Sequence, residues 1–355
     1  MGRRIVAAPR SRCLVWGAGA IGGTMGAFLS RAGHEVTLVD TVPEHVAAIN
    51  RAGLGITGPI AEFSTPVPAF TPEMLRGTWD TVIVATKAHH TDAAVRALLP
   101  HLSDSGCVIS AQNGLNELAI ARIVGEERTV GAFVNFGADY LEPGVILYGG
   151  RGTVTVGEAF GPPASRLSTR AVAIRDTWRD FDERAFATDN IFGYLWAKEA
   201  YGAMLFATAL TNDSIADALA RPEYRDLYIA LAREILAVAR ARGVRPAPFD
   251  GFDPGAYLPD ARAGAASQSL DALVAHNRKS AKTHSGIWRD LAVRKRPTEV
   301  DAQLGIVVSL GGEAGEPTPL TASVVNLIHD VERGVRPQAL ETLDALAAAM
   351  PGRRA

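Results

Sequence analysis

The sequence predicts an α/β protein in which a doubly wound, mostly parallel sheet is followed by an all-α domain. Short apolar runs alternate with helical patterns from residue 12 to about residue 190, which is typical of parallel sheets covered by helices. From Ile191 onward nearly every segment has the Ala- and Leu-rich spacing of helices. The 355 residues also exceed the size at which one hydrophobic core stops growing. We therefore expect a loose tail over residues 1–11 and two domains, 12–190 and 191–355.

The composition is that of an ordinary globular protein and argues against several classes. Hydrophobic residues make up 47% and charged residues 21% of the chain, and the net charge is −2. This balance gives no electrostatic reason to expect binding to nucleic acid or to an anionic membrane surface. No apolar stretch is long enough for a membrane span, and the one near the basic N-terminus is too short for a secretory signal. Cys13 and Cys107 lie in apolar runs without a framework of pairs, which favours a cytoplasmic location.

The first strand and the turn after it carry the strongest motif. Residues 13–16 form a short apolar run typical of a strand buried on both faces. Gly17, Gly19 and Gly22 follow with the G-x-G-x-x-G spacing of a turn that holds a dinucleotide pyrophosphate. Gly17 permits the tight turn, Gly19 lets the backbone approach the phosphates, and Gly22 lets the next helix pack on the strand. That helix, over residues 23–32, would point free N–H groups at the diphosphate.

The second strand, over residues 35–40, strengthens this interpretation. Its last residue, Asp40, comes 18 residues after Gly22, near the spacing of the acid that hydrogen-bonds a cofactor ribose. A glycine motif alone could be a structural turn in a chain that contains 35 glycines. Strand, turn, helix and acid together predict a Rossmann-type dinucleotide site.

The other elements follow in order. We expect strands over 80–87, 107–111, 129–133 and near 186–190, and helices from Pro43, over 92–99 and over 167–178. We also expect a hairpin over 53–68. Two short antiparallel strands, over 144–148 and 152–157, would lie at the edge of the sheet. In the second domain we expect helices over 194–210, 214–242 and 323–349, with a long connection over 244–264.

Several polar residues could serve chemistry. Lys87 ends a buried strand, where open α/β sheets bind ligands, although a solvated lysine would also fit there. Gln112, Asn113 and Gly114 follow another strand end, where Asn-Gly is also simply a good turn. Lys198 lies on a helix that is apolar nearly all round. Burial lowers the pKa of a lysine and makes it a usable proton donor, whereas a snorkelling lysine would have no such role.

The stretch over residues 282–301 is less easily assigned. His284 and Trp288 are four residues apart and would share a helix face. Thr298 and Asp301 have the spacing of a simple helix cap around Glu299. The basic side chains in between would form either a solvated face or an anion site; they are Arg289, Arg294, Lys295 and Arg296.

Over about residues 12–310 the chain resembles the ketopantoate reductases (2-dehydropantoate 2-reductases). The resemblance rests on the order and spacing of several pieces, none of which is diagnostic alone. They are Gly17-Ala-Gly-Ala-Ile-Gly22, Val84-Ala-Thr-Lys87, Gln112-Asn113-Gly114, Pro143-Gly144-Val145, Lys198, and Asp290 followed by Arg296-Pro-Thr-Glu299.

This resemblance implies a Rossmann domain and a helical domain, with the substrate in a cleft between them. It implies hydride transfer from NADH or NADPH to the ketone of a 2-oxo acid, as in ketopantoate to pantoate, and no metal. Lys198 would be the general acid, Glu299 would contact the substrate hydroxyl, and Lys87 and Asn113 would border the nicotinamide. The implied cofactor residues are Gly17, Gly19, Ala20, Ile21, Gly22, Asp40, Lys87 and Asn113, and the implied substrate residues are Asn113, Lys198, His284, Ser285 and Glu299.

The chain departs from the family pattern in two places. Most members have a basic residue after the second strand, whereas Asp40 would repel a 2′-phosphate, so we expect NADH over NADPH. One and two turns beyond Lys198, this chain has Gly202 and Phe206 where the family usually has asparagines that contact substrate. The serine run near residues 284–288 is also altered. A branched or bulkier 2-oxo acid, or an imine, would therefore fit as well as ketopantoate.

Two other functions remain open. A related two-domain dehydrogenase acting on an opine or a polyol phosphate would have the same layout. A non-catalytic NAD(H)-sensing module would need neither Lys198 nor Glu299, so their presence argues against it. The alanine-rich helices of the second domain could support a homodimer.

Overall fold

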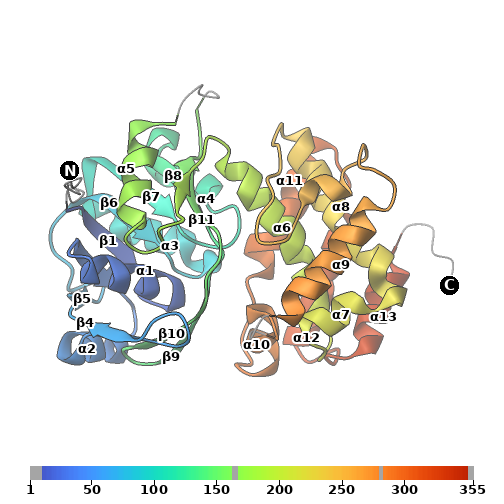
Figure 1. Cartoon of the computed structure of the whole chain (residues 1–355), viewed down its shortest axis with the longest axis horizontal. Helices are drawn as coiled ribbons and strands as arrows, with labels where there is room; N and C mark the ends of the chain where they lie inside the picture. Colours follow the sequence, from blue (N-terminus) through green and yellow to red (C-terminus); the bar gives the residue numbers. More distant parts are fainter. Residues whose placement is uncertain (1–9, 162–166, 280–282, 351–355) are drawn as a thin grey trace, which may run out of the picture. The chain divides into compact units, whose positions relative to one another are not determined.

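The computed structural model describes residues 10–161, 167–279 and 283–350, and it divides into two compact units, residues 1–191 and 192–355. Most of the predicted tail, residues 1–9, and Lys282 lie outside the described residues. Helices and strands alternate in the first unit, which is coloured from blue to green in Figure 1. All the named elements of the second unit are helices, so the predicted α/β fold with an all-α domain is confirmed.

An eight-stranded sheet forms the centre of the first unit. Its order is β12-β11-β8-β7-β6-β1-β2-β5, and every pair is parallel except β8 with β11. The strands are β1 (Arg12–Trp16), β2 (Glu35–Val39), β5 (Ala69–Phe70), β6 (Trp79–Val84), β7 (Leu102–Ser110), β8 (Thr129–Val134), β11 (Val154–Glu158) and β12 (Phe186–Ala187).

Helices cover both faces of this sheet because its central strands are apolar on both sides. Cys13 and Val15 of β1 join one hydrophobic cluster with residues of α1 (Ala20–Arg31) and α5 (Thr169–Trp178). Leu14 and Trp16 join a second cluster with residues of α3 (Thr91–Leu98) and α4 (Glu117–Val124). α2 (Pro43–Ala52) follows β2. Successive residues of β1 thus point to opposite faces of the sheet and belong to two different hydrophobic cores, as expected for a doubly wound sheet.

A second, four-stranded sheet has the order β4-β3-β10-β9. Its strands are β3 (Leu54–Thr57), β4 (Phe63–Thr65), β9 (Gly137–Glu142) and β10 (Val145–Gly150). The antiparallel pair β3–β4 confirms the hairpin predicted near residues 53–68. This sheet lies against α1, where a Cβ added at Gly23 would come within 2.3 Å of the Ile146 side chain. The glycine is therefore required for the helix and this sheet to approach each other.

The predicted pairing of residues 144–148 with 152–157 is wrong. β10 pairs with β9 and β3, whereas β11 joins the main sheet beside β8. Gly144, at φ +82°, forms the turn that folds β10 back on β9. Ile146 and Tyr148 are buried in β10, and Val154 and Val156 are buried in β11. Each strand has its own apolar face, and such alternation predicts a strand without specifying its partner.

In its described residues, 192–279 and 283–350, the second unit is built from α6 (Ile191–Thr208), whose first residue belongs to the first unit, and seven further α-helices. They are α7 (Ile215–Ala220), α8 (Arg225–Ala241), α9 (Ala265–Arg278), α10 (Gly286–Ala292), α11 (Ile306–Ala314), α12 (Pro319–Glu332) and α13 (Leu340–Ala348). A π-helical turn, η6 (Asp301–Gly305), leads into α11. No helix of the described residues is long and apolar enough to cross a bilayer.

Two predicted helices are each divided in the structure. The helix expected over 214–242 breaks at Pro222, which has no N–H to donate and disfavours a helical residue before it. The helix expected over 323–349 ends at α12, where Gly334 takes φ +70°, and α13 begins only after Pro337. In both places a proline or glycine outweighs a continuous apolar pattern.

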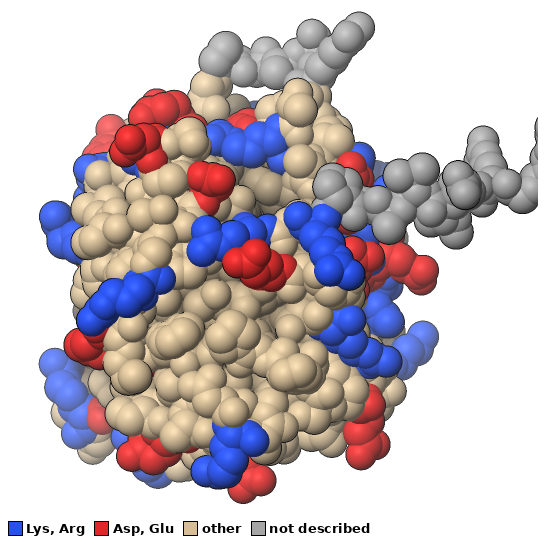
Figure 2. Space-filling view, turned by 90° about the vertical axis from the view of Figure 1, so that its left-hand side faces the viewer, with Lys and Arg blue, Asp and Glu red and all other residues tan. Residues whose placement is uncertain are grey.

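On the face drawn in Figure 2, lysine and arginine side chains are mixed with aspartate and glutamate side chains around an uncharged centre. The mixture agrees with the small net charge of the chain. It gives that face no field of a single sign of the kind that attracts nucleic acid.

Candidate active site

The glycine turn has the geometry of a phosphate-binding turn. Gly17 has φ +104°, and a Cβ there would lie 2.8 Å from the backbone of Ala85. A Cβ at Gly22 would lie 2.1 Å from the carbonyl oxygen of Gly17. Gly19, by contrast, has open space where a Cβ would be, and it caps α1 without any side-chain hydrogen bond. The first-turn N–H groups therefore adjoin open space that a diphosphate could enter.

Asp40 is fixed at the carboxyl end of β2. Its Oδ2 accepts a hydrogen bond from the Ala18 N–H at 3.0 Å, and its Oδ1 accepts one from the Val42 N–H at 3.1 Å. These two bonds hold the carboxylate beside the glycine turn. Each oxygen retains a second lone pair, so the group could also accept a hydrogen bond from a ribose hydroxyl.

His45 is a site residue that the sequence did not indicate. It is buried on α2, and its Nε2 lies 2.9 Å from the carbonyl oxygen of Ala18. The N–H of Gly144 donates to its Nδ1 at 2.9 Å, so Nε2 carries the proton. The ring thus joins the glycine turn to the β9–β10 turn. Only the folded chain brings these segments together, and no local pattern marks the histidine.

Lys87 and Asn113 lie on loops that a buried hydrogen-bond network connects. Gln112 Nε2 donates to the hydroxyl of Thr91 at 2.9 Å, and this hydroxyl lies 2.9 Å from Asn116 Oδ1. Asn116 Nδ2 donates to the carbonyl oxygen of Asn113 at 2.6 Å. The loops follow the neighbouring strands β6 and β7, and the Lys87 and Asn113 side chains are exposed at their surface. Thr91 and Asn116 were missed at the sequence level because their role depends on this pairing.

Lys198 lies on a half-buried stripe of α6. Apart from Phe192 in the first turn, the half-buried residues of this helix are spaced three or four apart, whereas the rest are buried. The members of the stripe are Tyr194, Lys198, Tyr201, Gly202 and Leu205. The lysine is thus more accessible than an all-round apolar helix suggests, because one face of α6 is only partly covered.

Glu299 is buried on a segment that α12 holds in place. Glu332 Oε1 accepts hydrogen bonds from the N–H and the hydroxyl of Thr298, at 2.7 and 2.8 Å. The Gln303 N–H donates to the carbonyl oxygen of Glu299 at 3.0 Å, which is a helical i, i+4 bond. Thr298 is therefore tied to α12 rather than serving only as the cap that its spacing suggested.

The basic cluster before Glu299 is partly neutralised. Asp290 is buried, and it forms ion pairs with Arg294 at 3.1 Å and Arg296 at 2.9 Å. Lys295 between them has φ +50°, an uncommon conformation for a residue with a side chain. Two of the four basic side chains thus hold the chain that leads to Glu299, which argues against a solvated face for the whole cluster.

Ser285 and His284 have structural partners. Ser285 Oγ accepts a hydrogen bond from the Trp288 N–H at 3.1 Å and so caps α10. The His284 and Trp288 rings lie 4.0 Å apart, centre to centre. Contact of either residue with substrate stays a prediction. Among the described residues, no group of three or more histidine, cysteine, aspartate or glutamate side chains is placed to hold a metal ion.

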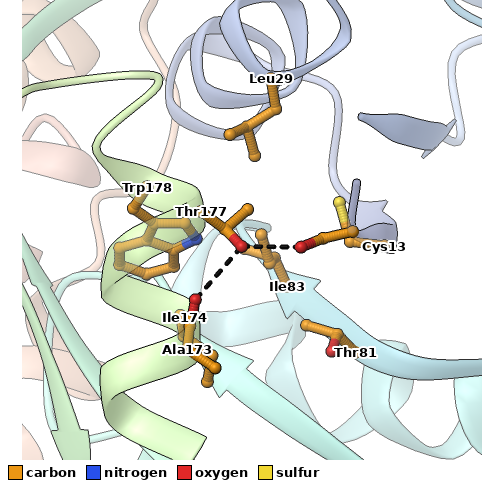
Figure 3. Close-up of a pocket in the computed structure, with 9 residues that line it drawn as sticks. Cys13, Leu29, Thr81, Ile83, Ala173, Ile174, Thr177 and Trp178 are labelled. Atoms are coloured by element: carbon orange, nitrogen blue, oxygen red, sulfur yellow. Dashed lines mark hydrogen bonds between the residues drawn. The ribbon is translucent and has the colours of Figure 1, made fainter. Parts of the chain in front are cut away.

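A cavity of about 100 Å³, drawn in Figure 3, lies beside Cys13 of β1, Ile83 of β6 and helix α5. Leu29, Ile174 and Trp178 line it, with the hydroxyls of Ser11 and Thr177 hydrogen-bonded at 2.7 Å. Cys13 also lines it, and burial raises the pKa of its thiol to about 12. Such a thiol is unreactive. No residue of the glycine turn lines this cavity, so it is not the dinucleotide site that the sequence predicts.

The open glycine turn at the carboxyl edge of this sheet, with a separate helical unit, defines a Rossmann-type protein of two units, an architecture common among nicotinamide-dependent dehydrogenases. A family model described as ketopantoate reductase PanE/ApbA matches residues 13–161, and the model of its C-terminal part matches residues 190–332. The chain belongs to the ketopantoate reductase family and is an oxidoreductase.

Individual relatives agree with this assignment. The 2-dehydropantoate 2-reductase of Archaeoglobus fulgidus is 27% identical over 330 residues, 91% of this chain and 99% of the relative. The ketopantoate reductase structure from Ralstonia eutropha JMP134 has a TM-score of 0.75 at 24% identity, covering 91% of this chain and 99% of that one. A ternary structure of D-mandelate dehydrogenase with NADH and anilino(oxo)acetate has a TM-score of 0.77 at 19% identity, with the same coverage. At these identities the two structures show a shared fold.

Proposed function

We propose that this enzyme reduces the ketone of a 2-oxo acid, either ketopantoate or a bulkier relative, and that NADH is its cofactor. The observation that carries the proposal is the open glycine turn at Gly19 with the Asp40 carboxylate fixed beside it. Membership of the ketopantoate reductase family supports the reaction, and the resemblance of the sequence to that family assigns Lys198 and Glu299 to it.

When bound, NADH supplies a hydride to the carbonyl carbon of the substrate. Lys198 then donates a proton from Nζ to the carbonyl oxygen, on which negative charge develops, and so acts as the general acid. Glu299 accepts a hydrogen bond from the substrate hydroxyl. Lys87 and Asn113 border the nicotinamide, and the Gln112–Thr91–Asn116 network fixes the loops that carry them.

The choice of NADH rests on Asp40. A carboxylate hydrogen-bonds a free ribose hydroxyl but repels a 2′-phosphate, and this carboxylate cannot easily turn away because two backbone N–H groups hold it. We expect kcat/KM for NADH to exceed that for NADPH by at least about tenfold, since like charges placed together cost several kcal/mol and a tenfold ratio needs only about 1.4 kcal/mol. Comparable values for the two cofactors, or a preference for NADPH, would contradict the assignment.

The substrate is tested by following NADH oxidation with a panel of 2-oxo acids. Ketopantoate represents one candidate, and phenylglyoxylate represents the bulkier class suggested by the D-mandelate dehydrogenase relative, which was solved with anilino(oxo)acetate. The same panel with added amines and a set of sugar phosphates tests for an opine or polyol-phosphate dehydrogenase. NADH binding without turnover of any of these compounds would favour an NAD(H)-sensing module instead.

Two further expectations belong with this function. Assembly as a homodimer is tested by light scattering during size-exclusion chromatography. A cytoplasmic location agrees with the two cysteines, Cys13 and Cys107, which are unpaired and buried in the structure.

A further inference from the structure

His45 connects three segments of the first unit through both of its ring nitrogens. It is 1% exposed on α2, where Nε2 donates to the carbonyl oxygen of Ala18 at 2.9 Å. Nδ1 accepts a hydrogen bond from the Gly144 N–H, in the turn between β9 and β10, also at 2.9 Å. The Tyr140 ring of β9 lies 5.0 Å away, centre to centre, at an angle of 73°. Rotation of the imidazole would break both hydrogen bonds, so its orientation is fixed.

The bond to Ala18 sets the direction of the next N–H group in the glycine turn. The Ala18–Gly19 peptide is trans, since no cis peptide bond occurs in the described residues. In a planar trans peptide the C=O and the N–H point in opposite directions. The Ala18 carbonyl points to His45, so the Gly19 N–H points away from that side chain. This N–H donates no hydrogen bond within the described part of the chain, and a Cβ on Gly19 would meet no atom within 4 Å.

Asp40 holds the other side of Ala18. The Ala18 N–H donates to Asp40 Oδ2 at 3.0 Å, while the Ala18 carbonyl oxygen accepts from His45. The two side chains thus fix two successive peptide planes, those before and after Ala18. Donors that are held in place before a ligand arrives lose little freedom when it binds, which raises affinity. Asp40 can also reach the ribose, whereas the buried His45 can act on a ligand only through the peptide.

We propose that His45 is a positioning residue of the cofactor site, which holds the Gly19 N–H in the direction from which it donates to the cofactor diphosphate. This inference rests on the proposed function. His45 does not touch the nucleotide but acts through the Ala18–Gly19 peptide. Its bond with Gly144 also makes the β9–β10 turn of the second sheet part of the support of the site. Without the donor at Nε2, the peptide can rotate and the Gly19 N–H loses its direction, so affinity for the cofactor falls.

Two substitutions separate the two hydrogen bonds of His45. The side-chain nitrogen of a glutamine reaches about as far from the backbone as Nε2 of a histidine, so His45→Gln keeps a donor for Ala18 but offers Gly144 no acceptor. The side-chain oxygen of an asparagine corresponds to Nδ1, so His45→Asn keeps the acceptor for Gly144 and loses the donor for Ala18. Each variant leaves one buried backbone group unpaired, so both should lose a similar amount of stability in denaturant unfolding.

The measurement is the Kd of ADP-ribose and of NADH, determined by isothermal titration calorimetry. We expect His45→Asn to raise both values by at least about tenfold, because a hydrogen bond to a charged diphosphate is lost. His45→Gln should raise them by less than about threefold, although its stability is lowered as much. In the reaction, the effect of His45→Asn should appear in the KM for NADH rather than in kcat at saturating NADH.

His34 provides the matched control. It is buried in the same unit, its Nδ1 accepts from the Ser11 N–H at 3.0 Å, and its Nε2 lies 2.8 Å from Asp180 Oδ2. It precedes β2, however, whereas Asp40 follows that strand. His34→Asn and His34→Gln should therefore lower stability and leave the Kd of ADP-ribose unchanged.

A further variant covers failure to fold. If His45→Asn is unfolded, as judged by circular dichroism, His45→Leu takes its place. It keeps a bulky side chain in the core and donates no hydrogen bond, so it should show the same loss of affinity.

The possible failures are distinguishable. If the wild type binds neither ADP-ribose nor NADH, the proposed function fails, and this inference fails with it. If the wild type binds both and reduces a 2-oxo acid, while the asparagine and glutamine variants of His45 have the same Kd for ADP-ribose, the proposed function stands and the positioning role is refuted. An equal loss of affinity in the His34 variants would show that affinity follows stability alone, and it would also refute the role.

Discussion

Lys198 combines two properties that a proton donor needs. It lies on a helix whose other faces are buried, which fixes the backbone, and it lies on the stripe of that helix that remains accessible. A lysine sealed in the core could not reach a substrate, and a fully solvated one would gain no orientation from the fold. A half-buried lysine fits both the functional and the snorkelling alternative, so its role in catalysis stays a prediction.

Replacement of this lysine tests the role. Lys198→Ala should lower kcat by about 100-fold or more, because removing a general acid has an effect of this size. NADH affinity should be little changed, since the residues proposed to hold the diphosphate and the ribose are those of the glycine turn and Asp40. Lys279→Ala, at the exposed lysine directly after α9, serves as the control. A loss that appears in KM alone would count against proton donation.

Glu117 shows how a single buried group links stability to pH. It is fully buried at the start of α4, and burial raises the pKa of its carboxyl from 4.5 to about 8. The folded protein therefore holds a proton that the unfolded chain releases between these two values. As far as Glu117 is concerned, the free energy of unfolding is highest below pH 4.5, falls as the pH rises through this range, and stays lower above pH 8.

Glu117→Gln removes this titration while preserving shape. At pH 8.5 we expect the free energy of unfolding of the variant, measured by denaturant titration, to exceed that of the wild type by more than about 1 kcal/mol. The reason is that each pKa unit corresponds to about 1.36 kcal/mol. The difference should shrink toward pH 5. Glu126→Gln, at an exposed glutamate just beyond the same helix, should have no such effect. A pH-independent difference for Glu117→Gln would show that the carboxyl is already ionised in the folded protein.

At the scale of elements, α12 anchors the segment that carries Glu299 at two points. Glu332 holds Thr298 on one side of it. His329, one turn earlier on α12, has one ring nitrogen 3.0 Å from Glu332 Oε2 and the other 3.0 Å from Asp301 Oδ1. Burial alone would lower the pKa of His329, but the hydrogen bonds to the two carboxylates outweigh it, so the pKa lies above 6.5. The protonated His329 ring thus connects Glu332, which holds Thr298, with Asp301 on the other side of Glu299.

This anchor should weaken as the pH rises. A histidine whose folded pKa is raised contributes stability below its unfolded value, and that contribution is lost as the pH passes the raised value. We expect the unfolding midpoint of the wild type to decrease above pH 6.5 more steeply than that of His329→Gln. Asp330→Asn breaks an ion pair with Arg333 on the same helix and should keep the wild-type slope. Equal slopes for wild type and His329→Gln would exclude a charged histidine.

At the scale of the whole molecule, the chain forms two compact units, and the proposed cofactor elements are all in the first. Binding to the folded state stabilises the elements that make contact with the ligand, by about 2.7 kcal/mol at a concentration 100 times Kd. The glycine turn and the loops after β6 and β7 are not neighbours in sequence, so their joint response would report a folded site rather than a local peptide.

Hydrogen exchange with and without NADH tests this arrangement. We expect slower exchange over residues 17–23, 85–91 and 111–117 when NADH is present, and a smaller effect with NADPH at the same concentration. Residues 54–65 of the second sheet serve as an internal control, because the proposed site does not include them. Protection confined to the second unit would place the nucleotide elsewhere.

The motifs of the first unit could be predicted because each one is local. The glycine turn needs Gly17, Gly19 and Gly22 at fixed spacing, whatever the rest of the chain does. His45 and Thr91 could not be found in this way. Their partners are distant in the sequence: Gly144 for His45, and Gln112 and Asn116 for Thr91. A side chain that acts through a distant segment leaves no periodic signal in its own neighbourhood.

By itself, the sequence determined most strands and helices of the first unit, because apolar spacing and turn residues act over a few positions. It also determined the glycine turn, the acid at Asp40 and the family resemblance. Tertiary structure alone decided that β10 leaves the main sheet for a second one and that His45 and Thr91 connect segments distant in the sequence. Strand partners and buried polar contacts depend on which surfaces meet, and that is settled by packing over the whole chain rather than by local preference.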